Sequence, residues 1–184
     1  HSFGNLFIVA MTNVTGSFEH ALHESSKVLA VHGRILPTTL ANLSLTAQLE
    51  DGTVVHGEST IPEHKGAIQR LSIEPNDAQA HPEAVEAINR AQLIVIGPGS
   101  LYTSVLPNLL VSGIAEAIMG SDALRTYVCN VVTQEGETDG YSVADHVEAL
   151  QAHTFPSIAD SVVYNDSPVQ LGPRIAGRPV IHGG

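Results

Sequence analysis

The chain has 184 residues, 43% of them hydrophobic, which is enough apolar material for the core of one globular domain. Eight lysines and arginines against 19 aspartates and glutamates give a formal net charge of −11. This charge repels phosphate backbones and acidic lipid surfaces, so we expect neither a nucleic-acid partner nor a membrane. The single cysteine, Cys129, cannot close an intrachain disulfide or build a thiolate metal site, which predicts a cytoplasmic protein with no bound metal.

The first predicted elements are a helix and a hairpin. Residues 17–31 carry apolar side chains at helical spacing, and Ser17 is placed to cap the helix. Residues 43–49 alternate apolar and polar side chains, Asp51-Gly52 favours a turn, and residues 53–55 resume a β-branched run. We therefore expect an antiparallel β-hairpin after the helix.

The rest of the chain alternates strands with helices. The predicted strands span residues 70–73, 93–96, 126–132 and 161–164, and the predicted helices span residues 82–90 and 142–150. The run Leu93–Ile96 is continuously apolar, as is typical of a central parallel strand buried on both faces. This order predicts an α/β, Rossmann-like three-layer fold, with helices on both faces of a mostly parallel sheet and a peripheral β-hairpin. Residues 1–165 form the predicted domain, and residues 166–184 form an irregular tail rich in proline and glycine.

Ligands in open parallel sheets bind beyond the carboxyl ends of the strands, which singles out the segment after Ile96. Two glycines there allow close approach to the backbone, and hydroxyls supply neutral donors, so the segment suits an anion. The candidate ligand-binding residues are Gly97, Pro98, Gly99, Ser100, Thr103 and Ser104. The alternative is a plain strand-to-helix turn whose hydroxyls cap the helix.

A second polar segment follows the strand predicted at residues 126–132. Its amides, hydroxyls and carboxylates can hold a ribose, a sugar hydroxyl or a divalent ion, and the alternative is a solvated acidic loop before a helix. The candidates in this segment are Asn130, Thr133, Gln134, Glu137 and Thr138, and the chain start adds His1, Ser2 and Asn5. The sequence has no Gly-x-Ser-x-Gly elbow, Walker pattern or Gly-x-Gly-x-x-Gly fingerprint, and its histidines lack zinc-site spacing, so it identifies no catalytic residue.

Three segments taken together resemble one family: His1–Asn5, Gly97–Asn108 and Cys129–Asp139. They are similar to the bacterial gluconeogenesis factor family, which is related to 2-phospho-L-lactate transferase, and the resemblance covers residues 1 to about 165. It implies a Rossmann-like fold, a cytoplasmic location and a small-molecule nucleotide ligand. Bacterial members of the family are associated with growth on gluconeogenic carbon sources, cell shape and the binding of UDP-sugars. The family's N-terminal Gly-rich segment is absent from this sequence, so we expect a fragment of a longer protein.

Three functional hypotheses follow. In the first, the parent protein is a regulator that binds a UDP-sugar or another nucleotide. In the second, the resemblance to the transferase branch implies an enzyme that moves a phospho-lactyl group from a nucleotide-activated donor to an alcohol, with magnesium held by Glu137 or Asp139. In the third, the hairpin at residues 43–58 is an interaction edge that pairs with a partner or a second copy of the chain, giving a homo-oligomer.

Overall fold

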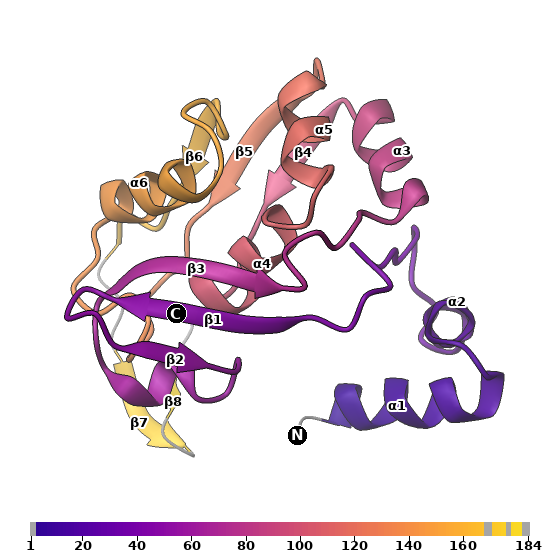
Figure 1. Ribbon diagram of the computed structural model, residues 1–184, viewed down its shortest axis with the longest axis horizontal. Helices are drawn as coiled ribbons and strands as arrows, with labels where there is room; N and C mark the ends of the chain where they lie inside the picture. Colours follow the sequence, from indigo (N-terminus) through magenta and orange to yellow (C-terminus); the bar gives the residue numbers. More distant parts are fainter. Residues whose placement is uncertain (1–2, 168–170, 176–177, 182–184) are drawn as a thin grey trace.

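Two β-sheets of three strands each organise the chain in the computed structural model, which describes residues 3–167, 171–175 and 178–181 (Figure 1). The antiparallel sheet has the order β2-β1-β3, and the parallel sheet has the order β4-β5-β6. Helices flank the parallel sheet, and one apolar core joins the two sheets. The predicted α/β class is therefore confirmed.

The predicted hairpin is part of the antiparallel sheet. Strands β1 (Ser44–Leu49) and β2 (Val54–His56) pair antiparallel, and the Asp51 carboxylate between them accepts the Thr53 N–H at 2.8 Å. The strand predicted at residues 70–73 is β3 (Ile68–Glu74), which pairs with the other edge of β1. Alternate side chains of β1 lie in the core, as period-two burial requires. Strand β2 is an edge strand of the sheet, and its pairing with a second copy stays a prediction.

The parallel sheet consists of three short strands joined by helices. Its strands are β4 (Leu93–Ile96), β5 (Leu124–Val128) and β6 (Ser161–Val163), and its helical segments are α3 (Pro82–Arg90), a π-helical turn η2 (Leu101–Val105), α4 (Leu106–Leu109), α5 (Ile114–Gly120) and α6 (Val143–His153). The predicted helix at residues 82–90 matches α3, and the one at residues 142–150 begins one residue later with Ser142 as its N-cap. The predicted sequence of strands is confirmed.

Two details of the predicted strands are wrong. Burial of β4 on both faces is not observed: Ile96 is buried, whereas Leu93 and Val95 are each 53% exposed. These two side chains share one face of an edge strand, and no described segment covers them. The strand predicted at residues 126–132 ends at Val128, because the Asn130 side chain turns back towards Gly99 instead of extending the ladder.

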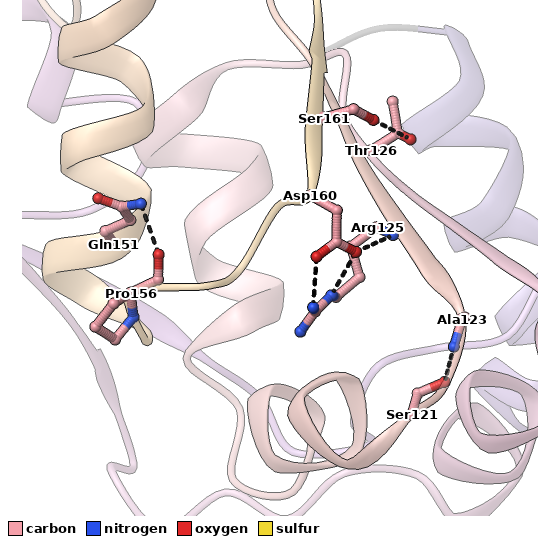
Figure 2. A network of polar contacts seen from close by, with 8 residues as sticks. All are labelled: Ser121, Ala123, Arg125, Thr126, Gln151, Pro156, Asp160 and Ser161. Atoms are coloured by element: carbon pink, nitrogen blue, oxygen red, sulfur yellow. Dashed lines mark hydrogen bonds and ion pairs between the residues drawn. The ribbon is translucent and has the colours of Figure 1, made fainter.

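A charged contact joins β5 to the segment before β6 (Figure 2). The Arg125 guanidinium donates to Asp160 through Nη2 at 2.6 Å and through Nε at 3.0 Å, and the Arg125 amide N–H donates to the same carboxylate at 2.9 Å. The Asp160 N–H donates back to the Arg125 carbonyl at 2.8 Å. These bonds, with the contact of Thr126 Oγ1 and Ser161 Oγ at 2.9 Å, fix the register of β6 on β5.

Both ends of the chain hold structure that the sequence analysis did not predict in full. The predicted helix at residues 17–31 is α2 (Phe18–Val28), with Ser17 as its N-cap, and a further helix, α1 (Phe3–Thr15), packs against it (Figure 1). The region expected to be an irregular tail contains an antiparallel pair, β7 (Leu171–Ile175) and β8 (Arg178–Ile181). A short 3-10 turn, η1 (Ile61–His64), follows β2. None of the described helices is long and apolar enough to cross a membrane.

Candidate functional site

The two polar segments predicted to bind a ligand lie side by side at the carboxyl ends of β4 and β5. The Gly99 N–H donates to Asn130 Oδ1 at 3.1 Å, and Asn130 Nδ2 donates to the Gly99 carbonyl at 2.8 Å. The amide side chain thus pairs with the backbone in the way that a neighbouring strand would. We call residues 97–104 the first loop and residues 130–138 the second loop.

Gln134 adds a second link between the loops. Its Nε2 donates to Ser100 Oγ at 2.6 Å, and its Oε1 accepts from Asn130 Nδ2 at 3.2 Å. The Ser100 side chain makes no capping bond to η2. The alternative interpretation, in which hydroxyls of the first loop cap the following helix, is therefore wrong for Ser100.

Glu137 supplies the cap that Ser100 does not. Its Oε2 accepts the amide N–H groups of Tyr102 and Thr103, each at 3.2 Å, and its Oε1 accepts the Thr103 hydroxyl at 2.9 Å. Amide groups in the first turn of a helix have no partner within the helix, so an acceptor from another segment stabilises them. Glu137 is only 6% exposed, which contradicts the alternative of a solvated acidic loop at this residue.

The turn that carries Glu137 is held by its own polar groups. Thr138 is fully buried, and its Oγ1 accepts the Gln134 N–H at 2.9 Å. Asp139 Oδ2 accepts the Gly136 N–H at 2.6 Å. Gly136 has φ +84°, and a Cβ built on it would lie 1.8 Å from the Pro62 carbonyl oxygen of η1. Only glycine fits this close approach, which joins the second loop to the antiparallel-sheet side of the molecule.

The first loop also depends on a glycine where it leaves β4. Gly97 has φ +82°, and a Cβ there would lie 2.8 Å from the Val128 carbonyl oxygen of the neighbouring strand. The glycine therefore lets the first loop turn directly over the end of β5. The sequence predicted that a ligand approaches the backbone at the glycines of this loop; the atom found close to Gly97 is the protein's own Val128 carbonyl oxygen, and the approach of a ligand stays a prediction.

The remaining predicted residues differ in their access to solvent. Pro98, Ser104 and Thr133 are exposed, and Gly99, Ser100, Thr103, Asn130 and Gln134 are partly exposed. Within the described ranges, no hydrogen-bond acceptor pairs with the amide N–H of Ser100. We call these exposed and partly exposed residues of the two loops, with the Ser100 amide, the rim; Glu137 and Thr138 are buried beneath it.

The structure does not test the N-terminal candidates as residues of the rim. His1 and Ser2 lie outside the described residues, and Asn5 lies within α1, which is seen apart from the carboxyl ends of the parallel strands in Figure 1. Their part in a ligand site stays a prediction.

Sequence reasoning missed a buried aromatic cluster beneath the first loop. Tyr102 Oη lies 2.8 Å from Tyr141 Oη and donates to the Ile68 carbonyl at 3.3 Å, and its ring meets His153 edge-on at 5.9 Å. Burial raises the pKa of the Tyr102 hydroxyl, and burial lowers the pKa of His153. Tyr102 lies within the Gly97–Asn108 segment, but its partners come from β3, from α6 and from Tyr141 just before α6. No local pattern could therefore have identified the cluster.

Cys129 does not have the environment of a reactive thiol, and the described acidic side chains do not gather into a metal-binding cluster. Burial raises the pKa of the Cys129 thiol, which disfavours the nucleophilic thiolate. In the described part of the chain, no three His, Cys, Asp or Glu side chains come together as a metal site. Both Glu137 oxygens already accept protein donors, so this carboxylate does not fit the role of a magnesium ligand.

Two cavities lie away from the paired loops. One, of about 520 Å³, lies between α2, the segment after it and the start of α3. The other, of about 370 Å³, lies between β1, β3 and the end of α6. Neither is lined by a residue of the first or second loop, so the rim is not part of either cavity.

Comparison with known proteins gives a consistent result. The family described as 2-phospho-L-lactate transferase CofD matches residues 1–173. A protein named gluconeogenesis factor from Bacillus subtilis is 50% identical over 169 residues, and one from Halalkalibacterium halodurans is 49% identical over 169 residues. These matches cover 92% of this chain but 53% and 52% of the two relatives, so the chain spans about half of their length.

A solved structure agrees with these matches. A crystal structure of a Bacillus halodurans protein superimposes with a TM-score of 0.86 at 49% identity, covering 92% of this chain and 55% of that one. The shared fold and the family match across most of the sequence lead to one assignment: the chain belongs to the CofD family, in the company of proteins named gluconeogenesis factor.

Proposed function

We propose that the protein containing this chain is a regulator that binds a UDP-sugar or a related nucleotide on the rim of the paired loops. The observation that carries the proposal is the double hydrogen bond between Gly99 and Asn130, which joins the two loops at the carboxyl edge of the parallel sheet. This edge is where ligands bind in open α/β sheets. Loops that are already held in place lose little conformational entropy when a ligand binds.

The chemistry of the rim suits a diphosphate joined to a polar sugar. The Ser100 amide N–H and the Ser104 hydroxyl offer neutral donors, and Gln134 offers the second hydrogen of its side-chain amide, whereas both Nδ2 hydrogens of Asn130 are engaged by Gly99 and Gln134. The chain carries a net charge of −11, so attraction to an anion has to come from such local donors and not from the overall field. In this proposal, ligand binding links the protein to growth on gluconeogenic carbon sources and to cell shape in the cytoplasm.

Calorimetry on the full-length protein with a panel of UDP-sugars tests the proposal. The Asn130→Ala variant removes two hydrogen bonds between the loops, worth about 1 kcal/mol each, so we expect binding weaker by at least roughly tenfold. Asn89→Ala is the matched control, because Asn89 is an exposed amide on α3 and its loss should leave affinity unchanged. Equal affinities for both variants, or no heat with any UDP-sugar, would contradict the proposal.

The family description favours a second candidate, transfer of a phospho-lactyl group to an alcohol. Asp139 is an exposed carboxylate beside the second loop whose Oδ2 accepts the Gly136 N–H, and in that reaction it would hold magnesium in place of the buried Glu137. Incubation of the full-length protein with a nucleotide-activated phospholactate, a deazaflavin alcohol and magnesium decides between the two. Product formation above background that Asp139→Asn abolishes favours the enzyme.

A further inference from the structure

Glu137 is a buried acid without a positive partner. It is 6% exposed, and no lysine, arginine or histidine forms an ion pair with it in the part of the chain that the structure describes. A buried carboxylate loses its hydration, which is costly in free energy, so its hydrogen bonds to the protein have to replace the lost water contacts. All three described bonds come from Tyr102 and Thr103, at the point where the first loop enters η2.

These bonds fix the first loop from below. One oxygen holds two consecutive amide N–H groups, and the other holds the Thr103 hydroxyl. The same Tyr102 is anchored at its far end to Tyr141 and to the Ile68 carbonyl. A loop held at its backbone by Glu137, and at its Tyr102 side chain by Tyr141 and by Ile68 of β3, has little freedom to move away from Asn130.

We propose that Glu137 is a positioning residue for the ligand rim, and that it acts through the acceptor geometry of its side chain and not through contact with ligand or magnesium. The effect on ligand affinity rests on the proposed function, whereas the statement that Glu137 holds the first loop does not. A glutamine can reproduce the arrangement: its Oε1 can accept both amide N–H groups, and its Nε2 can donate to the Thr103 hydroxyl. A residue that contacts a cation or a sugar hydroxyl as a carboxylate could not be replaced in this way.

The test compares Glu137→Gln with Glu137→Ala in the full-length protein. Two quantities are measured: hydrogen exchange at the Tyr102 and Thr103 amides, and affinity for UDP-N-acetylglucosamine by calorimetry. Glu135→Gln is the matched control, because it removes the same charge from the same loop at a side chain that contacts Lys65 on the surface. Thr103→Val, which deletes one of the three bonds, serves if Glu137→Ala does not fold.

We expect Glu137→Gln and Glu135→Gln to keep slow exchange at both amides and to bind within about threefold of the unmodified protein. Glu137→Ala should lose protection at both amides and bind at least roughly tenfold more weakly, with Thr103→Val between the two. If Glu137→Gln binds as weakly as Glu137→Ala while the amides stay protected, the charge contacts the ligand and the inference is overturned. Unchanged exchange in Glu137→Ala overturns it as well. Absence of binding by the unmodified protein overturns the proposed function alone, because the exchange comparison does not need a ligand.

Discussion

The contact between Gly136 and Pro62 allows a quantitative test of how the second loop is held. A Cβ at position 136 would lie 1.8 Å from the Pro62 carbonyl oxygen, 2.6 Å from its carbonyl carbon and 2.9 Å from its Cα. All three are backbone atoms of η1, so no side chain can rotate to make room. A Gly136→Ala variant must therefore move either η1 or the turn that carries Glu137.

The expected cost has two parts. Alanine at φ +84° costs roughly 1–2 kcal/mol from backbone strain alone. Relief of the overlap requires a backbone shift of about an ångström or more, which breaks the Gly136 bond to Asp139 and loosens the cap at Glu137, adding about 2–3 kcal/mol. We therefore expect Gly136→Ala to lower the free energy of unfolding by about 3–5 kcal/mol.

Gly140 provides the control within the same segment. It has φ +74°, but a Cβ there would meet nothing within 4 Å, so Gly140→Ala should cost only the strain of roughly 1–2 kcal/mol. Urea unfolding of the two full-length variants, followed by circular dichroism, measures the difference. Equal losses of stability would refute the contact with η1, and with it the argument that the second loop is anchored to the antiparallel-sheet side.

Three further predictions concern pH and salt. Burial lowers the pKa of His153, whose Nε2 accepts the Leu71 N–H at 3.0 Å. As pH drops below about 6.5, the unfolded chain takes up the proton before the folded chain does, so the free energy of unfolding should fall. His153→Gln should flatten the dependence of the urea midpoint on pH over this range. The Arg125 guanidinium lowers the pKa of Asp160. The stability that this ion pair adds above about pH 4 should be lost as pH falls through the lowered pKa of Asp160 in the folded chain. In Asp160→Asn, an acid titration of the free energy of unfolding should lack this loss. Because the chain carries a net charge of −11, added salt should leave UDP-sugar affinity unchanged or raise it, whereas a steep fall across a salt series in calorimetry would indicate a cationic site instead.

Local signals predicted much of the fold. The helix at residues 82–90 was predicted with its observed bounds because Pro82 fits the first turn and the apolar spacing is regular. The hairpin was predicted because alternation and Asp51-Gly52 are both short-range features. Helix α1 was missed because its sequence is apolar on most sides, and the pair β7–β8 was missed because Pro173 and Pro179 hide a strand pattern.

The proximity of the two loops could be predicted from the sequence, but the hydrogen bonds that join them could not. Topology alone places the ends of two parallel strands at one edge, so the proximity of the loops follows from the predicted order of strands. Which side chains face the surface and which support the loops from inside depends on contacts between distant residues: Glu137 and Thr103 are 34 residues apart in sequence, as are Ser100 and Gln134. Composition therefore indicated a polar rim, whereas the three-dimensional structure was needed to show that Glu137 and Thr138 support it from within.

The central claim is that the rim of the paired loops receives a nucleotide sugar, and a crystal structure of the full-length protein with UDP-N-acetylglucosamine tests it most directly. The account predicts diphosphate oxygens within hydrogen-bond distance of the Ser100 amide and the sugar beside Asn130 and Gln134, with Glu137 still bound to Tyr102 and Thr103. Ligand density elsewhere, such as the cavity beside α2, with the rim open to solvent would contradict it.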